Sequence, residues 1–193
     1  GKAVETAGDL DTLLLDKTGT ITIGNRKATN FYPANGVDAA TFTEACVLSS
    51  LADQTPEGKS IIELAKLDAN SFNTNGARFI EFTAETRSSG IDMEGMKIRK
   101  GAFDAIRNGV TRAGNSFPVD TDERVRKISS NGGTPLVVCQ NNVALGVIEL
   151  QDIIKPGIQE RFERLRKMGV KTVMVTGDNP LTAKFIAEKA GVD

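Results

Sequence analysis

The chain has 193 residues, with 24 lysines and arginines against 25 aspartates and glutamates, and it contains no histidine and no tryptophan. Without histidine, a Ser-His-Asp triad, a histidine-bearing zinc site and an imidazole general base are excluded, so catalysis must use carboxylates, hydroxyls, lysines or a bound metal. The formal net charge of −1 disfavours a nucleic-acid partner, because phosphate backbones are held by a basic field. The length fits one large domain or two small ones.

Cysteine usage and hydropathy predict a soluble piece from a reducing compartment. Cys46 and Cys139 are far apart in sequence and lie in apolar stretches, which predicts two reduced core thiols and a cytoplasmic environment. We find no stretch that approaches the roughly 20 apolar residues of a membrane-spanning helix. Residues 1–9 lack the apolar core and cleavage pattern of a signal peptide.

The first predicted element is a buried apolar strand over residues 11–16, DTLLLD, which ends on a carboxylate. The polar loop Lys17-Thr18-Gly19-Thr20 follows it, and residues 20–23 continue as a short extended piece. Gly24-Asn25 predicts a turn. Apolar density then falls as far as Gly36, so we expect a domain boundary after residue 23.

The next segments predict helices followed by antiparallel strands. Apolar residues at helical spacing behind an aspartate cap predict a helix over residues 38–52, and Thr55-Pro56 predicts the start of another helix. Alternating patterns over 78–82 and 90–100 predict antiparallel strands, with a turn at Glu94-Gly95. This part of the chain therefore has α+β character.

Another helix and a hairpin complete the middle of the chain. Residues 120–130 predict a short helix with a capping box, in which Asp120 is the cap and Glu123 the third position. Residues 134–150 predict a hairpin that turns at Asn141-Asn142. Both elements fit the α+β character of the preceding segments.

The C-terminal segment has the pattern of a parallel sheet. Residues 156–169 predict an amphipathic helix that begins at a proline and ends at a glycine. A strand over 170–175, the loop Thr176-Gly177-Asp178 and a helix over 180–191 follow. Strand, loop and helix in this order form one unit of a parallel α/β sheet.

Both ends of the chain thus carry α/β strands that lead to an aspartate, whereas the centre differs. We therefore predict an α/β fold in which an incomplete Rossmann-like domain, residues 1–23 and 150–193, is interrupted by an α+β domain with an antiparallel sheet, residues 24–149.

The loop DKTGT at residues 16–20 is the strongest chemical signal. A carboxylate at the tip of a parallel strand suits covalent phosphoryl transfer, because loop amides and hydroxyls can hold phosphate oxygens while Asp16 attacks the terminal phosphorus of a nucleotide. A bare strand-end aspartate more often caps its own turn. Taken alone, Thr176-Gly177-Asp178 indicates only a helix N-cap. It supports a phosphoryl-transfer site only because DKTGT is also present.

The segment TPEGKS at residues 55–60 ends like a phosphate-binding P-loop. A P-loop requires glycine five positions before its second glycine and a strand leading into it. Asp53 occupies that position and no strand precedes it. We therefore reject the P-loop interpretation.

DKTGT resembles the phosphorylation motif of the P-type ATPases, ion pumps that pass through an aspartyl-phosphate on a haloacid-dehalogenase-like domain. The resemblance implies that Asp16 is the phosphoryl acceptor, that the Asp16 carboxylate and Thr18 carbonyl bind magnesium, and that Thr176, Gly177 and Asp178 lie beside the phosphorylation loop. Related phosphatases carry an aspartate in place of Thr18 as general acid and base. A hydroxyl is a poor proton shuttle, so the resemblance also implies slow hydrolysis of the phosphoenzyme.

The same resemblance implies an ATP site in the inserted domain. Phe82 matches the family's adenine-stacking aromatic residue, and Lys100-Gly101-Ala102 matches its KGA motif. Stacking on an aromatic ring contributes about 1–3 kcal/mol per base, and Gly101 permits close backbone approach because it has no Cβ. Without the KGA motif, a lone phenylalanine on a strand would be predicted to pack in the core. The implied site comprises Asp53, Glu57, Phe82, Thr83, Thr86, Arg87, Ser88, Ser89, Lys100 and Gly101.

Segments across nearly the whole chain, among them LLLDKTGT, LADQTPEGKSI, IRKGAFDAI and LRKMGVKTVMVTGDN, resemble the Kdp-type potassium-transporting branch of the family. Heavy-metal pumps carry a His-Pro pair in this domain, and this chain has no histidine. Calcium and sodium pumps have much longer insertions. Both facts argue against these other branches. The resemblance implies ATP and magnesium as cofactors, the other Kdp-type subunits and a membrane domain as partners, and a position on the cytoplasmic side of the cell membrane. We expect this piece to be monomeric.

The printed chain departs from the family's pattern. It does not contain the family's downstream lysine, its GDGxNDxP loop, the TGE loop of the actuator domain or the membrane helices. We therefore expect weak ATP binding, in the high micromolar to millimolar range, no sustained ATPase activity, and rapid amide exchange over residues 171–175. Two alternatives stay open: a phosphatase of the same superfamily with a cap domain, and a non-catalytic nucleotide-binding module.

Overall fold

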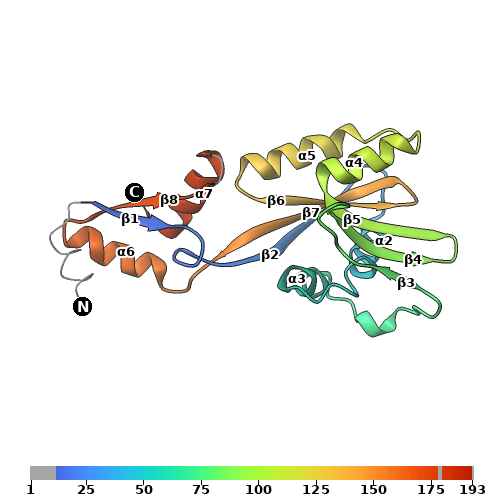
Figure 1. Ribbon diagram of the computed structural model, residues 1–193, viewed down its shortest axis with the longest axis horizontal. Helices are drawn as coiled ribbons and strands as arrows, with labels where there is room; N and C mark the ends of the chain where they lie inside the picture. Colours follow the sequence, from blue (N-terminus) through green and yellow to red (C-terminus); the bar gives the residue numbers. More distant parts are fainter. Residues whose placement is uncertain (1–11, 178–179, 193) are drawn as a thin grey trace. The chain divides into compact units, whose positions relative to one another are not determined.

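The computed structural model describes residues 12–177 and 180–192 (Figure 1). The chain divides into two compact units. Unit 1 contains the described parts of residues 1–25, 130–132 and 152–193, and unit 2 contains residues 26–129 and 133–151. Unit 1 is therefore built from segments at both ends of the sequence.

Unit 1 centres on a two-stranded parallel sheet of β1 (Thr12–Asp16) and β8 (Lys171–Val175). Helices α6 (Ile158–Lys167) and α7 (Pro180–Ala190) contribute Ile158, Phe162, Ile186 and Ala190 to its core. Leu15 and Met174 pack against that core. The pairing of the two sequence ends in one parallel sheet confirms the predicted α/β arrangement.

The prediction that β1 is buried is wrong for one of its faces. Successive side chains of a strand point to opposite faces, and in this sheet only the face carrying Leu15 packs on the core. Leu14 is 65% exposed and Val175 is 51% exposed. The apolar run therefore identified a strand correctly but not its degree of burial.

Unit 2 is built on a six-stranded sheet whose strands lie in the order β2-β7-β6-β5-β4-β3. Each pair from β7 through β3 is antiparallel, which confirms the predicted antiparallel sheet. The strands are β2 (Thr22–Pro33), β3 (Arg78–Ile80), β4 (Ser88–Met93), β5 (Met96–Ala102), β6 (Thr134–Gln140) and β7 (Val143–Ile154).

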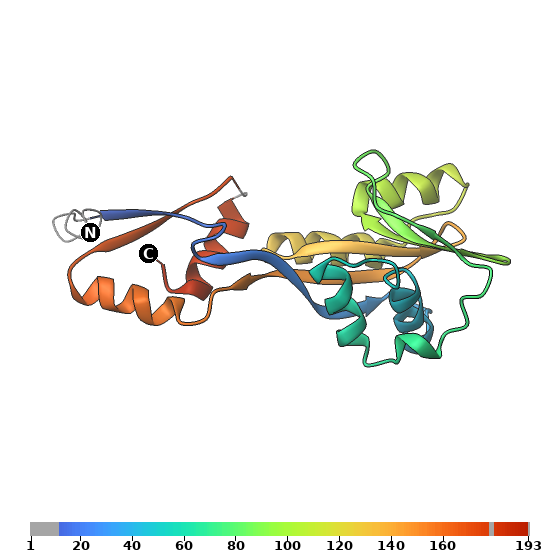
Figure 2. The same cartoon turned by 60° about the horizontal axis from the view of Figure 1, so that its bottom comes forward.

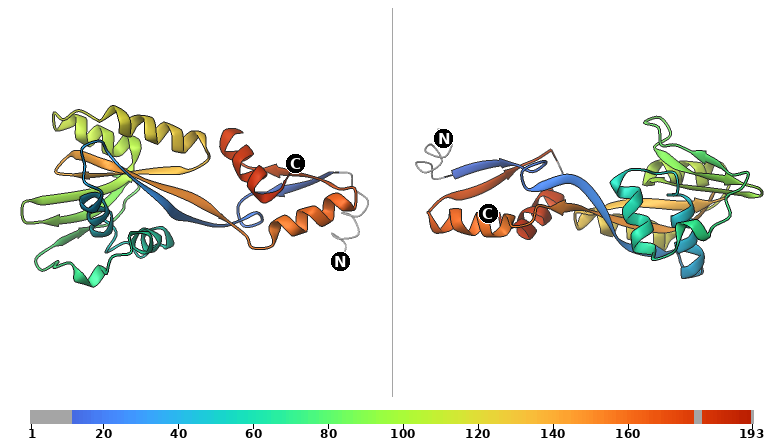
Figure 3. Two further views of the ribbon diagram at one scale, coloured as in Figure 1. Left: turned by 180° about the vertical axis from the view of Figure 1, so that it is seen from behind. Right: turned by 90° about the horizontal axis from the view of Figure 1, so that it is seen from below.

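Helices cover both faces of this sheet, as Figures 1 and 2 show. On one face, α4 (Phe103–Arg112) and α5 (Val119–Ser130) pack on the side chains of Val137 and Val147. On the other face, α2 (Ala39–Leu48) and α3 (Pro56–Ala65) pack on those of Val138 and Ile148. The 3-10 turn η1 (Ala69–Ser71) follows α3. The views in Figure 3 show the same separation of the two helix pairs.

Several local predictions are confirmed. The Asp38 carboxylate accepts a hydrogen bond from the amide of Thr41 at the start of α2, and the Thr55 hydroxyl accepts one from the amide of Gly58 at the start of α3. Asn141 and Asn142 both have positive φ, 51° and 62°, as a two-residue hairpin turn of type I′ requires. Both cysteines are free and buried.

Other local predictions are wrong. Helix α2 ends at Leu48 rather than Ala52, because the amide of Ser50 bonds to the carbonyl of Val47 and tightens the last turn. Asp120 is not the cap of α5, since the helix already begins at Val119 and the Asp120 carboxylate accepts a hydrogen bond from the amide of Asn35.

The predicted turn at Gly24-Asn25 is absent, because β2 runs through these residues with Gly24 at a φ of 85°. Helix α6 begins at Ile158, two residues after Pro156, because Gly157 adopts a left-handed conformation at the N-cap. Helix α4 was not predicted at all. Within the described residues, we find no helix with the length and hydropathy to cross a membrane.

Candidate functional site

The first candidate site lies at the carboxyl edge of the sheet in unit 1. Asp16 ends β1 opposite Val175, which ends β8. The amide of Lys17 donates to the carbonyl of Val175 at 3.1 Å. Because the strands are parallel, Thr176 and Gly177 leave the sheet at the edge where Asp16 lies. Asp178, the third residue of that motif, lies outside the described residues.

The loop after Asp16 folds back on itself. The carbonyl of Lys17 accepts hydrogen bonds from the amides of Ile21 and Thr22, at 2.9 and 3.0 Å, and the amide of Gly19 donates to the carbonyl of Thr22 at 2.9 Å. Gly19 has a φ of 82°, a conformation that glycine adopts without steric cost. The loop is thus held by its own backbone.

The two charged side chains of this loop differ in their surroundings. Lys17 is buried, and its Nζ lies 3.4 Å from the Asp152 carboxylate. Asp16 is exposed. Among residues 12–177 and 180–192, the Asp16 carboxylate has no hydrogen bond or ion pair. The Asp16 oxygens are therefore available to a ligand approaching this edge.

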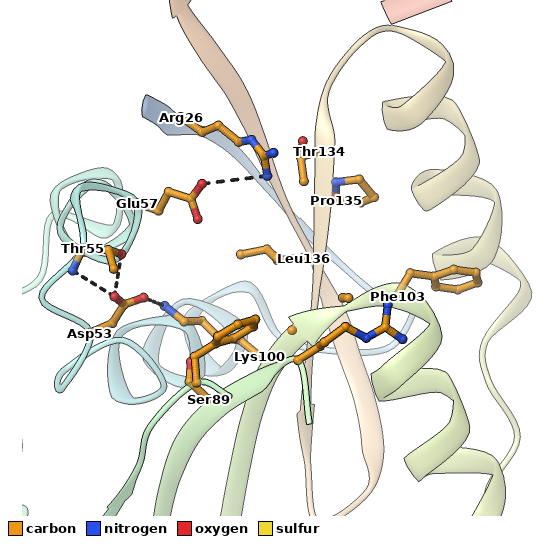
Figure 4. A pocket seen from close by; sticks show the side chains of 14 residues that line it. Arg26, Asp53, Thr55, Glu57, Ser89, Lys100, Phe103, Thr134, Pro135 and Leu136 are labelled. Carbon is orange, nitrogen blue, oxygen red and sulfur yellow. Dashed lines mark hydrogen bonds and ion pairs between the residues drawn. The ribbon is translucent and has the colours of Figure 1, made fainter. Parts of the chain in front are cut away.

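The second candidate site is a cavity of about 510 Å³ in unit 2 (Figure 4). It collects residues from β2, α3, β4, β5, α4 and β6 and from the loops beside them. Seven of the ten residues predicted for nucleotide binding line it. The lining residues are Arg26, Asp53, Thr55, Glu57, Phe82, Arg87, Ser89, Lys100, Gly101, Ala102, Phe103, Thr134, Pro135 and Leu136.

A buried ion pair closes one side of the cavity. The side chain of Lys100 is 4% exposed, and its Nζ donates to Asp53 Oδ2 at 2.7 Å and to Ser50 Oγ at 2.9 Å. Burial lowers the pKa of Lys100, although the hydrogen bond and charge of Asp53 oppose that shift. Burial alone would raise the pKa of Asp53, but hydrogen bonds from Lys100 and Thr55 bring it below its ordinary value. Each member of the pair therefore stabilises the charged form of the other.

The start of α3 holds Asp53 in place. Asp53 Oδ1 accepts hydrogen bonds from the amide of Thr55 at 3.0 Å and from its hydroxyl at 2.5 Å. The same hydroxyl oxygen accepts from the amide of Gly58. A Cβ on Gly58 would lie 2.4 Å from Cγ of Asp53. Only glycine at position 58 thus lets the Asp53 side chain lie against the helix.

Three of the predicted residues, Thr83, Thr86 and Ser88, do not line the cavity. The hydroxyls of Thr83 and Thr86 bond to each other at 2.7 Å, and the amide of Thr86 donates to the Thr83 hydroxyl at 3.0 Å. These threonines close the turn between Phe82 and β4. Ser88 begins β4 and pairs with Gly101.

Phe82 and Arg87 lie at the two ends of that turn, and both line the cavity. Phe82 is 63% exposed, which is unusual for a large apolar side chain and leaves its ring available for stacking. The Arg87 guanidinium pairs with the Asp104 carboxylate at 2.5 Å. The turn therefore presents one aromatic ring and one fixed cation to the cavity.

Gly101 has a structural reason of its own to be glycine. A Cβ at this position would lie 2.4 Å from the carbonyl oxygen of Arg87 and 2.8 Å from Cβ of Ser88. The close approach that glycine permits here is thus between β5 and the start of β4. The prediction that Gly101 serves close approach of a nucleotide stays untested.

Seven cavity residues were not predicted from the sequence: Arg26, Thr55, Ala102, Phe103, Thr134, Pro135 and Leu136. Ala102 is the third residue of the KGA motif, and Thr55 was noted only as a helix start. Leu136 lies beside Ala102 because β6 pairs with β5. Arg26 comes from β2, and its guanidinium lies 3.9 Å from the Glu57 carboxylate. Sheet pairing, which the local sequence does not reveal, brings these residues to the cavity.

The cavity combines an apolar interior with a few charged groups. Phe82, Leu136, Pro135 and Ala102 offer apolar surface, and Figure 4 shows Arg26 and Glu57 apart from the Lys100–Asp53 pair. Pockets of this size and character hold small ligands, with sparse polar groups fixing their orientation. The arrangement suits a flat heteroaromatic ring with a polar extension. We find no cluster of three or more metal-ligating side chains in the described part of the chain.

Comparisons with known proteins identify the family of the chain and a relative. The model of the haloacid dehalogenase-like hydrolase family matches residues 10–193. The chain is 55% identical, over its whole length, to the potassium-transporting ATPase ATP-binding subunit of Erwinia tasmaniensis, of which it spans 29%.

Two solved structures share the fold. The crystal structure of a zinc-transporting PIB-type ATPase is 25% identical, with a TM-score of 0.74 over 99% of this chain and 29% of that one. The catalytic domain of the CPx-ATPase CopB-B is 17% identical, with a TM-score of 0.63 over this whole chain and 64% of that one, which shows the fold alone.

Proposed function

Because the chain belongs to the haloacid dehalogenase-like hydrolase family, we propose that it is the ATP-binding and phosphoryl-accepting part of a potassium-transporting P-type ATPase. The observation that carries the proposal is the parallel pairing of β1 with β8, in which Asp16 lies opposite Val175. This pairing brings the DKTGT loop and Thr176-Gly177 to one sheet edge, as a phosphoryl-transfer site on an α/β sheet requires. The relative with 55% identity, a potassium-transporting ATPase subunit, supports the choice of ion.

In this proposal, the cavity of unit 2 holds adenine. Phe82 is exposed and lines the cavity, so its ring can stack on the base. Asp53, Glu57, Arg87, Ser89, Lys100 and Gly101 supply the remaining contacts. The volume of about 510 Å³ lies in the range of small-ligand pockets.

Asp16 then accepts the terminal phosphate. A carboxylate oxygen of Asp16 forms a bond to the γ-phosphorus, the bond from that phosphorus to the β–γ bridging oxygen breaks, and ADP leaves. The Asp16 carboxylate and the Thr18 carbonyl are hard oxygen donors of the kind magnesium prefers, and bound magnesium would neutralise charge on the phosphates. Thr176 and Gly177 would lie beside the transferred group, and the family resemblance implies a role there for Asp178 as well.

Thr18 favours this function over a phosphatase. A phosphatase of the same superfamily would carry an acid–base residue where this chain has the hydroxyl of Thr18, which is a poor proton shuttle near neutral pH. Water should therefore attack the acyl phosphate slowly, and a phosphoenzyme can persist. We further propose that the other Kdp-type subunits and a membrane domain are partners, with this part on the cytoplasmic side of the cell membrane.

Phe82→Ala tests the proposed adenine site. We expect the dissociation constant for ATP, measured by calorimetry, to rise about 5- to 150-fold, because stacking of a base on an aromatic ring contributes about 1–3 kcal/mol. Phe79→Ala is the matched control, since Phe79 is also an exposed phenylalanine, on β3, but does not line the cavity. Equal ATP affinities for the two variants would place the base elsewhere.

A further inference from the structure

Unit 2 contains another cavity, of about 160 Å³, that the proposed function does not use. It is formed by the end of β2, the segment that follows it and the first turns of α5. None of its lining residues belongs to the cavity that we assign to ATP. The volume is far larger than one water molecule needs. The lining residues are Tyr32, Pro33, Asn35, Asp120, Thr121 and Arg124.

The guanidinium of Arg124 lies over an aromatic ring and has no acidic partner. Its Cζ is 4.1 Å from the centroid of the Tyr32 ring, a distance at which a cation is attracted to the ring face. The Tyr32 hydroxyl donates to Oε1 of Glu149 at 3.1 Å, which holds the ring in place. Within the described part of the chain, the N–H groups of Arg124 make no hydrogen bond or ion pair. A guanidinium in this position can bind a carboxylate through two parallel hydrogen bonds.

The hydroxyl of Thr121 also lacks a partner. Thr121 is 2% exposed, and its Oγ1 makes no hydrogen bond to any described residue. A buried hydroxyl without a partner costs free energy, and buried polar groups are therefore nearly always hydrogen-bonded. Since Thr121 lines the cavity, a polar group bound there can supply the partner.

The charges around the cavity limit what it can bind. Asp120 lies in the first turn of α5, where the helix dipole favours a negative charge. Its Oδ2 accepts a hydrogen bond from the amide of Asn35 at 2.8 Å. The one arginine of the lining is thus balanced by one aspartate. A ligand with two negative charges would be repelled by Asp120, so a single negative charge fits better.

We propose that this cavity binds a small monocarboxylate, whose carboxylate pairs with the guanidinium of Arg124 and accepts a hydrogen bond from the hydroxyl of Thr121. The carboxylate gives both unpartnered groups a partner at once. The volume leaves room for a short carbon chain beside the apolar ring of Pro33. This site does not depend on ATP binding or on phosphate transfer to Asp16.

Titration of the whole chain with sodium acetate, followed by NMR, tests the proposal. We expect the backbone amide signals of Asn35 and Thr121 to shift and to saturate, whereas sodium chloride at the same concentrations should leave them in place. Arg124→Gln should weaken acetate binding at least about tenfold, because hydrogen bonds to a charged group are lost. Thr121→Val should weaken it about two- to tenfold, since one hydrogen bond from a hydroxyl is lost.

Arg126→Gln is the matched control. Arg126 lies on the same helix, its Nε is 3.3 Å from Oδ1 of Asp122, and it does not line the cavity. Both substitutions remove one positive charge from α5, so they change the general attraction of anions equally. Arg126→Gln should therefore keep the wild-type affinity for acetate. Arg124→Lys repeats the test if Arg124→Gln does not fold, because it keeps the charge but loses the planar pair of donors.

Three results would overturn the proposal. Equal shifts with acetate and chloride would mean that the cavity holds water only. Equal losses in Arg124→Gln and Arg126→Gln would mean that acetate is attracted by the charge of the helix and not by this site. Tighter binding of inorganic phosphate than of acetate would contradict the choice of a monocarboxylate. None of these results bears on the ATP site, whose test is the Phe82→Ala variant.

Discussion

Asp53→Ala is expected to lower the free energy of unfolding by about 3 kcal/mol, because removal of one partner leaves a buried charge uncompensated. In this variant, the ammonium of Lys100, with its side chain 4% exposed, would retain Ser50 as an acceptor but lose the carboxylate at 2.7 Å. Urea denaturation measures the change. This expected cost lies at the upper end of the range of about 0.5–3 kcal/mol that is typical of single substitutions.

The double variant Asp53→Ala with Lys100→Met serves as the control. Removal of both charges leaves no buried ion to compensate, so the double variant should be more stable than Asp53→Ala alone. The pair is not coupled if the stability losses of Asp53→Ala and Lys100→Met add up to the loss of the double variant. The same conclusion follows if Asp53→Ala costs less than about 0.5 kcal/mol.

The same pair gives a pH dependence of defined sign. The pKa of Asp53 is lower in the folded protein than its ordinary value, so the unfolded chain takes up this proton first as the pH falls. The contribution of Asp53 is therefore fully present above about pH 4, and it is lost as the pH falls through the folded pKa. The stability difference between wild type and Asp53→Ala should shrink over that window.

Gly58→Ala is expected to destabilise the protein by about 1–3 kcal/mol, which is typical of an overpacked site. The added Cβ would lie 2.4 and 2.6 Å from Cγ and Cβ of Asp53, so the carboxylate must leave its place beside Lys100. ATP affinity should fall with it. Urea denaturation and calorimetry on the same variant measure both effects.

Gly109→Ala separates this clash from the effect of alanine on a helix. Gly109 lies within α4, and a Cβ there would meet its nearest atom, Oδ1 of Asn142, at 4.0 Å. Alanine should therefore stabilise this helix by about 0.5–1 kcal/mol and leave ATP affinity unchanged. Stabilisation of Gly58→Ala to the same extent would mean that Gly58 does not position Asp53.

The elements that sequence analysis predicted well carry local signals. Apolar runs followed by polar loops identified β1 and β8, and Asp38 and Thr55 identified the starts of α2 and α3. The turn at Asn141-Asn142 was predicted because asparagine tolerates the positive φ that such a turn requires. In each case, residues adjacent in sequence determine the local structure.

Elements without such signals were missed. Strand β2 is largely exposed over residues 23–27 and has no apolar run. Helix α4 has no side-chain cap, since Ala102 is its N-cap residue, although Ile106 and Val110 have helical spacing. Long-range pairing and packing stabilise these elements, and neither is visible in a window of sequence.

The candidate site shows the same division. Asp53, Phe82 and Lys100 were predicted from the family resemblance and do line one cavity. Thr83 and Thr86 were predicted with them, as part of the stretch from Phe82 to Ser89, but they close their own turn instead. The contribution of β6, including Leu136, depends on its pairing with β5. The contact of Ser50 with Lys100 was not predicted because the two residues lie fifty positions apart in the sequence.

Phosphate transfer to Asp16 is tested most directly by incubating the natural polypeptide that carries this sequence with magnesium and ATP radiolabelled at the γ-phosphate, followed by acid quenching and peptide mapping. The expected result is a hydroxylamine-sensitive label on Asp16 that is absent from Asp16→Asn. A label that persists in Asp16→Asn, or that maps to another residue, would contradict the assignment of Asp16 as phosphoryl acceptor.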